Sequence, residues 1–154
     1  MQNHYNIVDT ENGYSFTTDF GAVYQLTFLF YPLVNARADY NMYMFNIELL
    51  KKGKTNTDEK IRLTIEYVLQ TFFSENNNAI VIILDSFDNR QFVRKRLFEK
   101  WFLQTPNNTI EKIETICHID DIQLITMLLV EKHNPLRNII KDDYFDLVKI
   151  NFYS

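Results

Sequence analysis

Glycine, proline and cysteine are scarce in this chain, which has three glycines, three prolines and one cysteine. So few glycines leave the backbone few places to approach a phosphate closely, which argues against a glycine-rich nucleotide loop. The one cysteine, Cys117, cannot form an internal disulfide, and this favours a cytoplasmic protein. The apolar runs are far shorter than the roughly 20 residues that span a bilayer, and the N-terminus does not resemble a signal peptide. We therefore expect a soluble protein with no membrane partner.

The usual patterns of catalytic and metal-binding residues are also lacking. His4, His118 and His133 do not have metal-ligand spacing, and none of the serines has the glycine neighbours of a nucleophile elbow. The adjacent pairs Asp120-Asp121 and Asp142-Asp143 fit turns better than acid–base catalysis, which needs carboxylates that converge in space. We expect no metal and no cofactor, and we favour a protein that is not an enzyme.

Aromatic residues, in contrast, are abundant, with 13 Phe and 9 Tyr. A chain of 154 residues with a hydrophobic fraction of 46% can bury one core, and we expect a single domain over residues 1–154 with many rings inside it. The net charge of −4 gives no overall attraction to nucleic acid, so any such role would need a local basic patch.

The first 50 residues predict an antiparallel meander. Asn12-Gly13 is a strong two-residue hairpin signal, because both turn positions need positive φ, and Asp19-Phe20-Gly21 predicts a second turn. Two later strands alternate in polarity, which indicates one buried face and one wet face. The expected buried residues are Tyr24, Leu26, Phe28, Phe30, Tyr43, Phe45, Ile47 and Leu49. The opposite face, with Gln25, Thr27, Asn46 and Glu48, is a candidate protein-partner or dimer surface.

The rest of the chain predicts helices and strands in alternation. An apolar stripe at helical spacing predicts a helix over 57–74, capped by Asn56 or Thr57. AIVIIL does not alternate, which is typical of a central strand covered on both faces. Further predicted elements are a helix over 88–103, a strand hairpin over 110–119 and 122–131 whose first strand also fits a helix, a short helix from Pro135 to about Lys141, and a last strand over 147–153.

Together these elements predict an α+β fold, with an antiparallel-rich mixed sheet of about six or seven strands and two main helices packed on it. From residue 41 to residue 131 the element order resembles the N-acetyltransferase superfamily, in which a helix follows strand four, a second helix follows strand five, and two strands finish the domain. That resemblance implies a loop for the pyrophosphate of acetyl-CoA at KKGKTNTD. The superfamily's loop is glycine-rich, whereas here only Lys52, Gly53, Lys54 and Thr55 are available as weak candidates. A solvated turn is the simpler interpretation.

A second resemblance is to a group of small, uncharacterised bacterial proteins. It depends on the aromatic meander and on two segments, D-x-x-I-x-x-T-I-x-x-V from Asp58 to Val68 and D-x-R-x-x-x-R from Asp88 to Arg94. This resemblance implies no activity.

The stretch DSFDNRQFVRKRLFEKWF, residues 85–102, contains the main candidate site. At helical spacing Arg90 and Arg94 project into the apolar sector beside Trp101, where an unpaired guanidinium would cost several kcal/mol. Two partners are considered for these arginines: a carboxylate such as Asp85 or Asp88, or a bound anionic ligand at the end of the central strand. Nucleic-acid binding through this helix, whose Lys95 and Arg96 fall on its polar side, is a third and disfavoured interpretation.

Three functions remain open. The favoured one is a small binding or protein-interaction module that contacts itself or a partner chain. The first alternative is a divergent acyltransferase-like enzyme that binds an acyl-CoA or another anionic ligand, for which Glu48 or Tyr144 could be invoked as base or acid. The second alternative is a nucleic-acid-associated accessory protein.

Overall fold

The computed structural model describes residues 3–54, 59–74, 78–85, 95, 96, 99 and 109–152. The strands are β1 Val8–Thr10, β2 Gly13–Thr17, β3 Val23–Tyr31, β4 Met42–Lys51, β5 Ala79–Asp85, β6 Ile110–Ile119 and β7 Ile122–Glu131. The helices are α1 Glu59–Phe73 and α3 Arg137–Phe152. Among these residues all strands join one mixed sheet of seven strands in the order β1-β2-β3-β4-β5-β7-β6. The predicted α+β class and strand number are confirmed.

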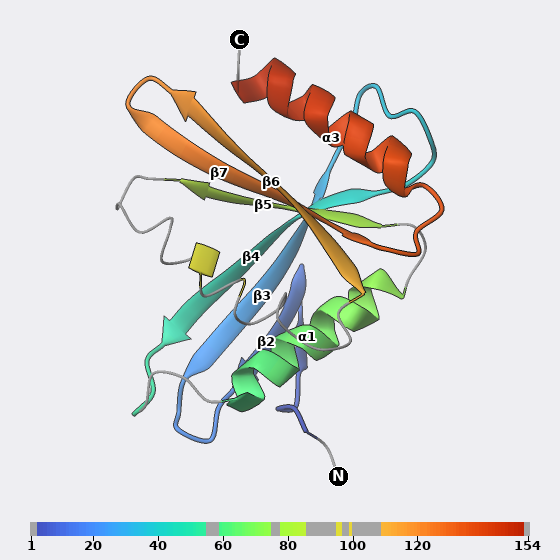
Figure 1. The fold of residues 1–154 in the computed structure, drawn as a ribbon. Helices are drawn as coiled ribbons and strands as arrows, with labels where there is room; N and C mark the ends of the chain where they lie inside the picture. The colour runs from blue at the N-terminus through green and yellow to red at the C-terminus, as the bar shows by residue number, and fades with distance from the viewer. Residues whose placement is uncertain are drawn as a thin grey trace.

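The two helices cover opposite faces of this sheet (Figure 1). Alternate residues of β5 show this, because Ile80 and Ile82 pack in a core with α1, whereas Ala79 and Val81 pack in a second core with α3. All four are at most 5% exposed. β5 is therefore the central, doubly covered strand that its uninterrupted apolar run predicted. We call the two sides of the sheet the α1 face and the α3 face.

The two cores differ in composition. The core on the α1 face is rich in rings, and Phe28 stacks on Phe72 with centroids 4.4 Å apart. α1 contributes the stripe predicted for it, with Ile61, Ile65, Val68, Leu69 and Phe73 buried and Phe72 partly buried. The core on the α3 face is mainly aliphatic. The expected buried aromatic residues are therefore concentrated on the α1 face, and Tyr144 is the fully buried ring on the α3 face among the described residues.

The first hairpin exists, but its turn lies one residue earlier than predicted. Gly13 already pairs with Thr10, so the turn residues are Glu11 and Asn12, and among the described residues only Gly21 and Asp120 have positive φ. Gly13 serves another purpose, because a Cβ there would lie 1.9 Å from the carbonyl oxygen of Leu26 on β3. Close approach of two strands, rather than turn conformation, explains this glycine.

The other two predicted turns are present. Gly21 has φ of 88° and its N–H donates to the carbonyl of Thr18 at 3.1 Å. Asp120 and Asp121 join β6 to β7, with Asp120 at φ of 53°. β6 is a strand over its whole predicted length, which settles its helix-or-strand ambiguity.

The end of the chain differs from the prediction. The segment 147–152, expected as part of a last strand, belongs to α3, and the short helix expected to stop near Lys141 continues to Phe152. Its predicted cap is confirmed, since Asn134 Oδ1 accepts a hydrogen bond from the N–H of Leu136 at 2.8 Å. The buried residues Ile140, Tyr144 and Val148 are spaced by four and face the sheet together. None of the helices within the described ranges is long and apolar enough to cross a membrane.

Candidate functional site

β4 and β5 are parallel neighbours that pair over a short length only. Their register has three residue pairs, from Met42↔Ala79 to Met44↔Val81. Beyond these, β4 continues beside β3 to Lys51 and β5 continues beside β7 to Asp85. Figure 1 shows the two strands diverging toward their carboxyl ends. In open sheets with parallel strands, ligands commonly bind at this end of the strands.

A narrow, mostly apolar fissure lies on the α3 face where the two strands part. Its volume is 20 Å³. The lining side chains come from β3, β4, β5, β7 and α3: Tyr31, Met42, Met44, Val81, Ile83, Thr126, Tyr144, Leu147 and Val148. Two of the four methionines, Met42 and Met44, line this fissure, and Met42 is also a buried residue of the core on the α3 face.

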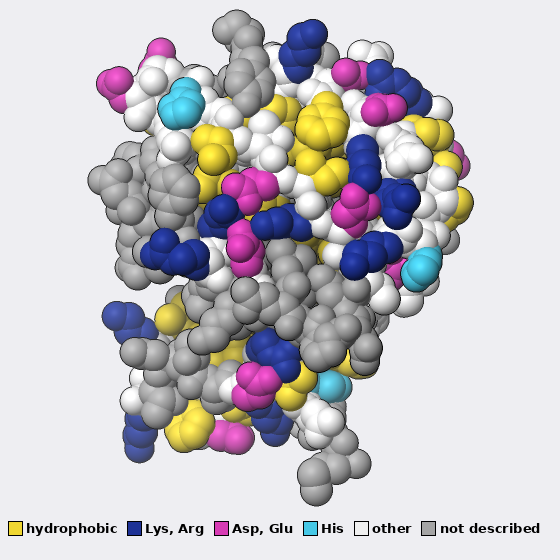
Figure 2. Space-filling view, viewed as in Figure 1, with side chains coloured by type: hydrophobic (Ala, Val, Ile, Leu, Met, Phe, Trp, Pro, Cys, Tyr) yellow, Lys and Arg dark blue, Asp and Glu magenta, His cyan; other side chains and the backbone are white. Residues whose placement is uncertain are grey.

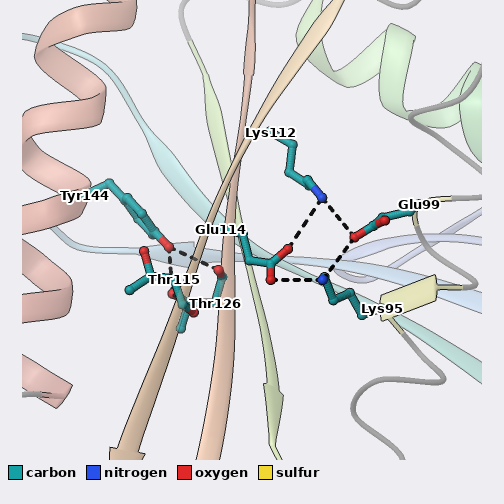
Figure 3. Close-up of polar contacts among 7 residues, drawn as sticks. All are labelled: Lys95, Glu99, Lys112, Glu114, Thr115, Thr126 and Tyr144. Carbon is teal, nitrogen blue, oxygen red and sulfur yellow. Dashed lines mark hydrogen bonds and ion pairs between the residues drawn. The ribbon is translucent and has the colours of Figure 1, made fainter.

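The polar side chains of the fissure, Thr126 and Tyr144, bond to one another. Their hydroxyl oxygens are 2.6 Å apart, and the Tyr144 hydroxyl also donates to the carbonyl of Thr126 at 3.2 Å (Figure 3). Both side chains are buried, and burial raises the pKa of the Tyr144 phenol. A neutral phenol held by β7 anchors α3 to the sheet.

A larger groove adjoins the fissure on the same face. It has a volume of 340 Å³ and lies between the segment after β3 and the second half of α3. Tyr31 and Leu147 line both the groove and the fissure. The remaining groove residues are Pro32, Leu33, Val34, Asn35, Ala36, Asp143, Asp146 and Lys149.

A buried carboxylate fixes the wall of this groove. Asp143 Oδ1 pairs with the Arg37 guanidinium at 2.6 Å, while its Oδ2 accepts from the Tyr40 hydroxyl at 2.7 Å and from the Arg37 backbone N–H at 3.2 Å. Arg37 also pairs with Asp146, one turn further along α3. These bonds hold the loop 32–41 against α3. Burial, followed by the bond to Asp143, raises the pKa of the Tyr40 phenol.

We call the bonds from Asp143 to Arg37 and Tyr40 the clamp, and the sequence did not predict them. Asp142-Asp143 was expected in a turn, but both residues lie in α3, where Asp143 is 6% exposed. Arg37 and Asp143 are 106 residues apart in the chain, so local pattern gives no signal for the pair.

The lysine-rich turn after β4 is exposed at Lys52 and Lys54. Gly53 packs on the earlier turn, because a Cβ there would lie 2.8 Å from the backbone N of Ala22 and from the carbonyl oxygen of Phe20. The N–H of Lys54 donates to that same carbonyl at 3.0 Å. This close packing is a sufficient reason for a glycine at position 53, so no bound phosphate is needed to explain it. Thr55 lies outside the described residues.

The other predicted site residues are only partly described. Asp85 is the last residue of β5 and pairs with Leu124 across the ladder to β7, but its side chain is outside the described set. Asp88, Arg90 and Arg94, together with Trp101, also lie outside the described residues. Their proposed contacts stay predictions.

Lys95 and Glu99, which follow β5 in the chain, form ion pairs with β6 that the sequence did not suggest. Lys95 was expected on the wet side of its helix, but its Nζ pairs with Glu114 on β6 at 3.0 Å (Figure 3). Lys112 on β6 pairs with Glu99 at 2.9 Å. The bond to Lys112 is the main cause that lowers the pKa of Glu99, and the bond to Glu114 is the main cause that raises the pKa of Lys95.

The pairing of these lysines with carboxylates bears on nucleic-acid binding. Lys95 is committed to carboxylates, and Figure 2 shows basic and acidic side chains interleaved over the described part of this face. Phosphate binding depends on concentrated positive charge, so this arrangement weakens the nucleic-acid interpretation. Within the described residues no group of three or more His, Cys, Asp or Glu side chains could hold a metal ion.

Comparison with known proteins gives a family and no activity. Residues 57–146, more than half of the chain, match the family of unknown function DUF6169. No curated protein and no solved structure matches. The matched region begins just before α1 and ends within α3 at Asp146, so it contains Asp143, Tyr144 and Thr126 but not β4. The predicted resemblance to uncharacterised proteins is confirmed, and the chain belongs to the family of unknown function DUF6169.

Proposed function

We propose that this protein binds an acyl-CoA or a closely related thioester in the cleft between β4 and β5. The observation that carries the proposal is the divergence of two parallel strands after three residue pairs, with an apolar fissure where they part. An extended chain with amide groups, such as the pantetheine arm of coenzyme A, can enter where the ladder stops and bond to strand backbone, as peptides do at sheet edges.

The charges near the cleft support an anionic ligand. β4 and β5 run in the same direction, so their carboxyl ends reach the same edge of the sheet. The exposed Lys52 and Lys54 follow β4, and we propose that they and Thr55 contact the phosphates. We further propose that the segment after β5, with Asp85, Asp88, Arg90 and Arg94, borders the reactive end of the ligand.

The element order adds support of a weaker kind. A helix follows β4, and two antiparallel strands complete the sheet after β5, as in the N-acetyltransferase superfamily that the sequence resembles. The chain departs from that pattern in its closing helix α3 and in its glycine-poor turn. We assign no catalytic residue, so the proposed function is binding. The buried, free Cys117 suits the reducing cytoplasm that we propose as its location.

Thermal unfolding with and without ligands tests this function. Coenzyme A or acetyl-CoA at about 100 times its Kd should stabilise the protein by about 2.7 kcal/mol, which raises Tm by roughly 5–10 °C. ATP at the same concentration serves as an anion without the pantetheine arm and should have a smaller effect. Lys52→Ala and Lys54→Ala should each weaken binding of coenzyme A, whereas Lys132→Ala, an exposed lysine after β7, should not. A Tm that neither coenzyme A nor acetyl-CoA changes would refute the proposal.

A protein-interaction role is the second candidate, because large apolar side chains are exposed at both ends of the β3–β4 ladder, Leu29 and Phe30 at one end and Leu49 and Leu50 at the other. Leu29 is 48% exposed, Phe30 59%, Leu49 45% and Leu50 53%. Phe30 and Leu49 were expected to be buried, so the predicted alternation ends before the strands do.

The polar surface predicted on the same strands is partly exposed, with Asn46 and Glu48 exposed and Gln25 and Thr27 half-buried. Sedimentation over a range of concentrations tests self-association. A dimer that Leu50→Glu converts to a monomer, while the control Val8→Glu on β1 does not, would support it. A monomer at all concentrations would leave only a different chain as partner.

A further inference from the structure

We infer that the fissure and the adjoining groove hold the acyl chain of the ligand, so that the ligand is a thioester of a medium-length acyl group rather than of acetate. The inference depends on the proposed thioester binding in the cleft and names the chemical class of the acyl group. Its basis is a pair of adjoining, mostly apolar spaces on the α3 face, of which the fissure lies where β4 and β5 part.

The first step concerns position. Met44 and Val81 form the last residue pair of the two strands, and both line the fissure together with Ile83 two residues further along β5. A thioester that enters between the separated strands therefore meets the fissure at once. The acyl group, which extends beyond the pantetheine arm, is the part of the ligand that would point into it.

The second step concerns polarity. The fissure walls are aliphatic and thioether side chains apart from Tyr31, Tyr144 and Thr126, and the last two bond to each other at 2.6 Å. Because these two hydroxyl groups already bond to each other, they need no polar group from the ligand. A hydrocarbon chain can therefore lie beside them without leaving a hydroxyl unpaired. The fissure is narrow, but Met42 and Met44 are unbranched and flexible and can move apart around a chain.

The third step concerns length. Tyr31 and Leu147 line both spaces, so the 20 Å³ fissure and the 340 Å³ groove adjoin at these two side chains. Pro32, Leu33 and Val34 extend the apolar lining there, and Val34 is 93% exposed. Asp143 and Asp146, which also line the groove, are both paired with Arg37. Their carboxylates therefore do not favour a cationic ligand. An acetyl group would leave this groove unused, whereas a longer acyl chain would extend toward it.

Calorimetric titration with coenzyme A and with acetyl-, hexanoyl- and octanoyl-CoA tests the inference. Each methylene that is buried should lower Kd by about fourfold, so three buried methylenes should make octanoyl-CoA roughly 60-fold tighter than acetyl-CoA. Leu147→Trp places a bulky ring at the junction of fissure and groove and should remove most of this gain, so that acetyl- and octanoyl-CoA have similar Kd values. Phe145→Trp is the matched control on the same helix, because Phe145 is 49% exposed and lines neither space. Phe145→Trp should keep the increase in affinity with acyl-chain length.

The outcomes separate the two proposals. Equal Kd values for acetyl- and octanoyl-CoA in the unmodified protein would overturn the inference and leave thioester binding standing. A chain-length gain that persists in Leu147→Trp would also overturn it, by placing the acyl chain elsewhere. Absence of binding by coenzyme A and by all three thioesters would overturn both proposals. The Kd values of the unmodified protein for coenzyme A and the three thioesters test the inference even if Leu147→Trp does not fold.

Discussion

Asp143 links a loop and a helix that are far apart in the chain. Its carboxylate accepts hydrogen bonds from the Arg37 guanidinium, the Arg37 backbone and the Tyr40 hydroxyl, and its side chain is 4% exposed. Asp143→Asn keeps the shape of the side chain but removes its charge and puts an NH₂ donor opposite other donors. We expect the free energy of unfolding to fall by about 2 kcal/mol, as measured by urea denaturation.

The neighbouring Asp142 provides the control, since it lies on the same helix but is exposed. Asp142→Asn should change the free energy of unfolding by less than about 0.5 kcal/mol. Equal stabilities of the two variants would show that the clamp contributes nothing to folding.

Residue identity alone could not have predicted this clamp. A buried aspartate in a helix depends on partners that the helix does not contain, and Arg37 lies in a loop whose sequence has no regular pattern. The lining of the fissure was equally hidden, because Met42 and Met44 would suit any core. What the sequence does indicate is the central strand β5, since an uninterrupted apolar run is typical of a strand covered on both faces.

At the scale of elements, α1, β5 and the β6–β7 hairpin were predictable because their local pattern and their tertiary environment agree. α3 was not, because its last six residues, LVKINF, are rich in residue types that favour strands. The spacing of four between Ile140, Tyr144 and Val148 was the signal that could have found it, and packing on the sheet overrode the local preference. Burial of that stripe explains why α3 continues to Phe152.

The ion pairs between the segment after β5 and strand β6 give the protein a defined pH dependence. Lys112 lowers the pKa of Glu99 in the folded state, so the folded carboxyl binds a proton less readily than the unfolded one. Glu99 therefore stabilises the fold above its unfolded pKa, and this contribution is lost as the pH falls through its lower folded pKa. Glu99→Gln should cost up to about 1 kcal/mol at pH 7, and the difference should shrink below about pH 4.

Urea denaturation of both proteins at a series of pH values measures this difference. Glu48→Gln is the control, because Glu48 is an exposed glutamate on β4. It should give the same stability as the unmodified protein at every pH. A loss in Glu99→Gln that is as large at pH 3 as at pH 7 would mean that the charge of Glu99 is not the cause.

At the scale of the whole molecule, one sheet separates two cores that share β5. Ile65 on α1 and Ile140 on α3 are each 0% exposed and lie on opposite faces. Alternate side chains of a single strand serve the two cores, so neither core can lose its packing without exposing the back of the other. We therefore propose that residues 1–154 are one cooperative domain, as their length predicts.

Ile65→Ala and Ile140→Ala test this cooperativity. Each should lower the free energy of unfolding by about 2–5 kcal/mol, because each leaves a cavity in a closed core. In both variants the transitions followed by far-UV and near-UV circular dichroism should coincide and keep an unchanged m value, since the whole chain unfolds at once. If Ile140→Ala instead produced an early transition of only part of the signal, α3 would unfold separately from the sheet. The clamp at Asp143, the fissure and the groove would then belong to a part of the molecule that can detach, and ligand binding in the groove would stabilise that first transition selectively.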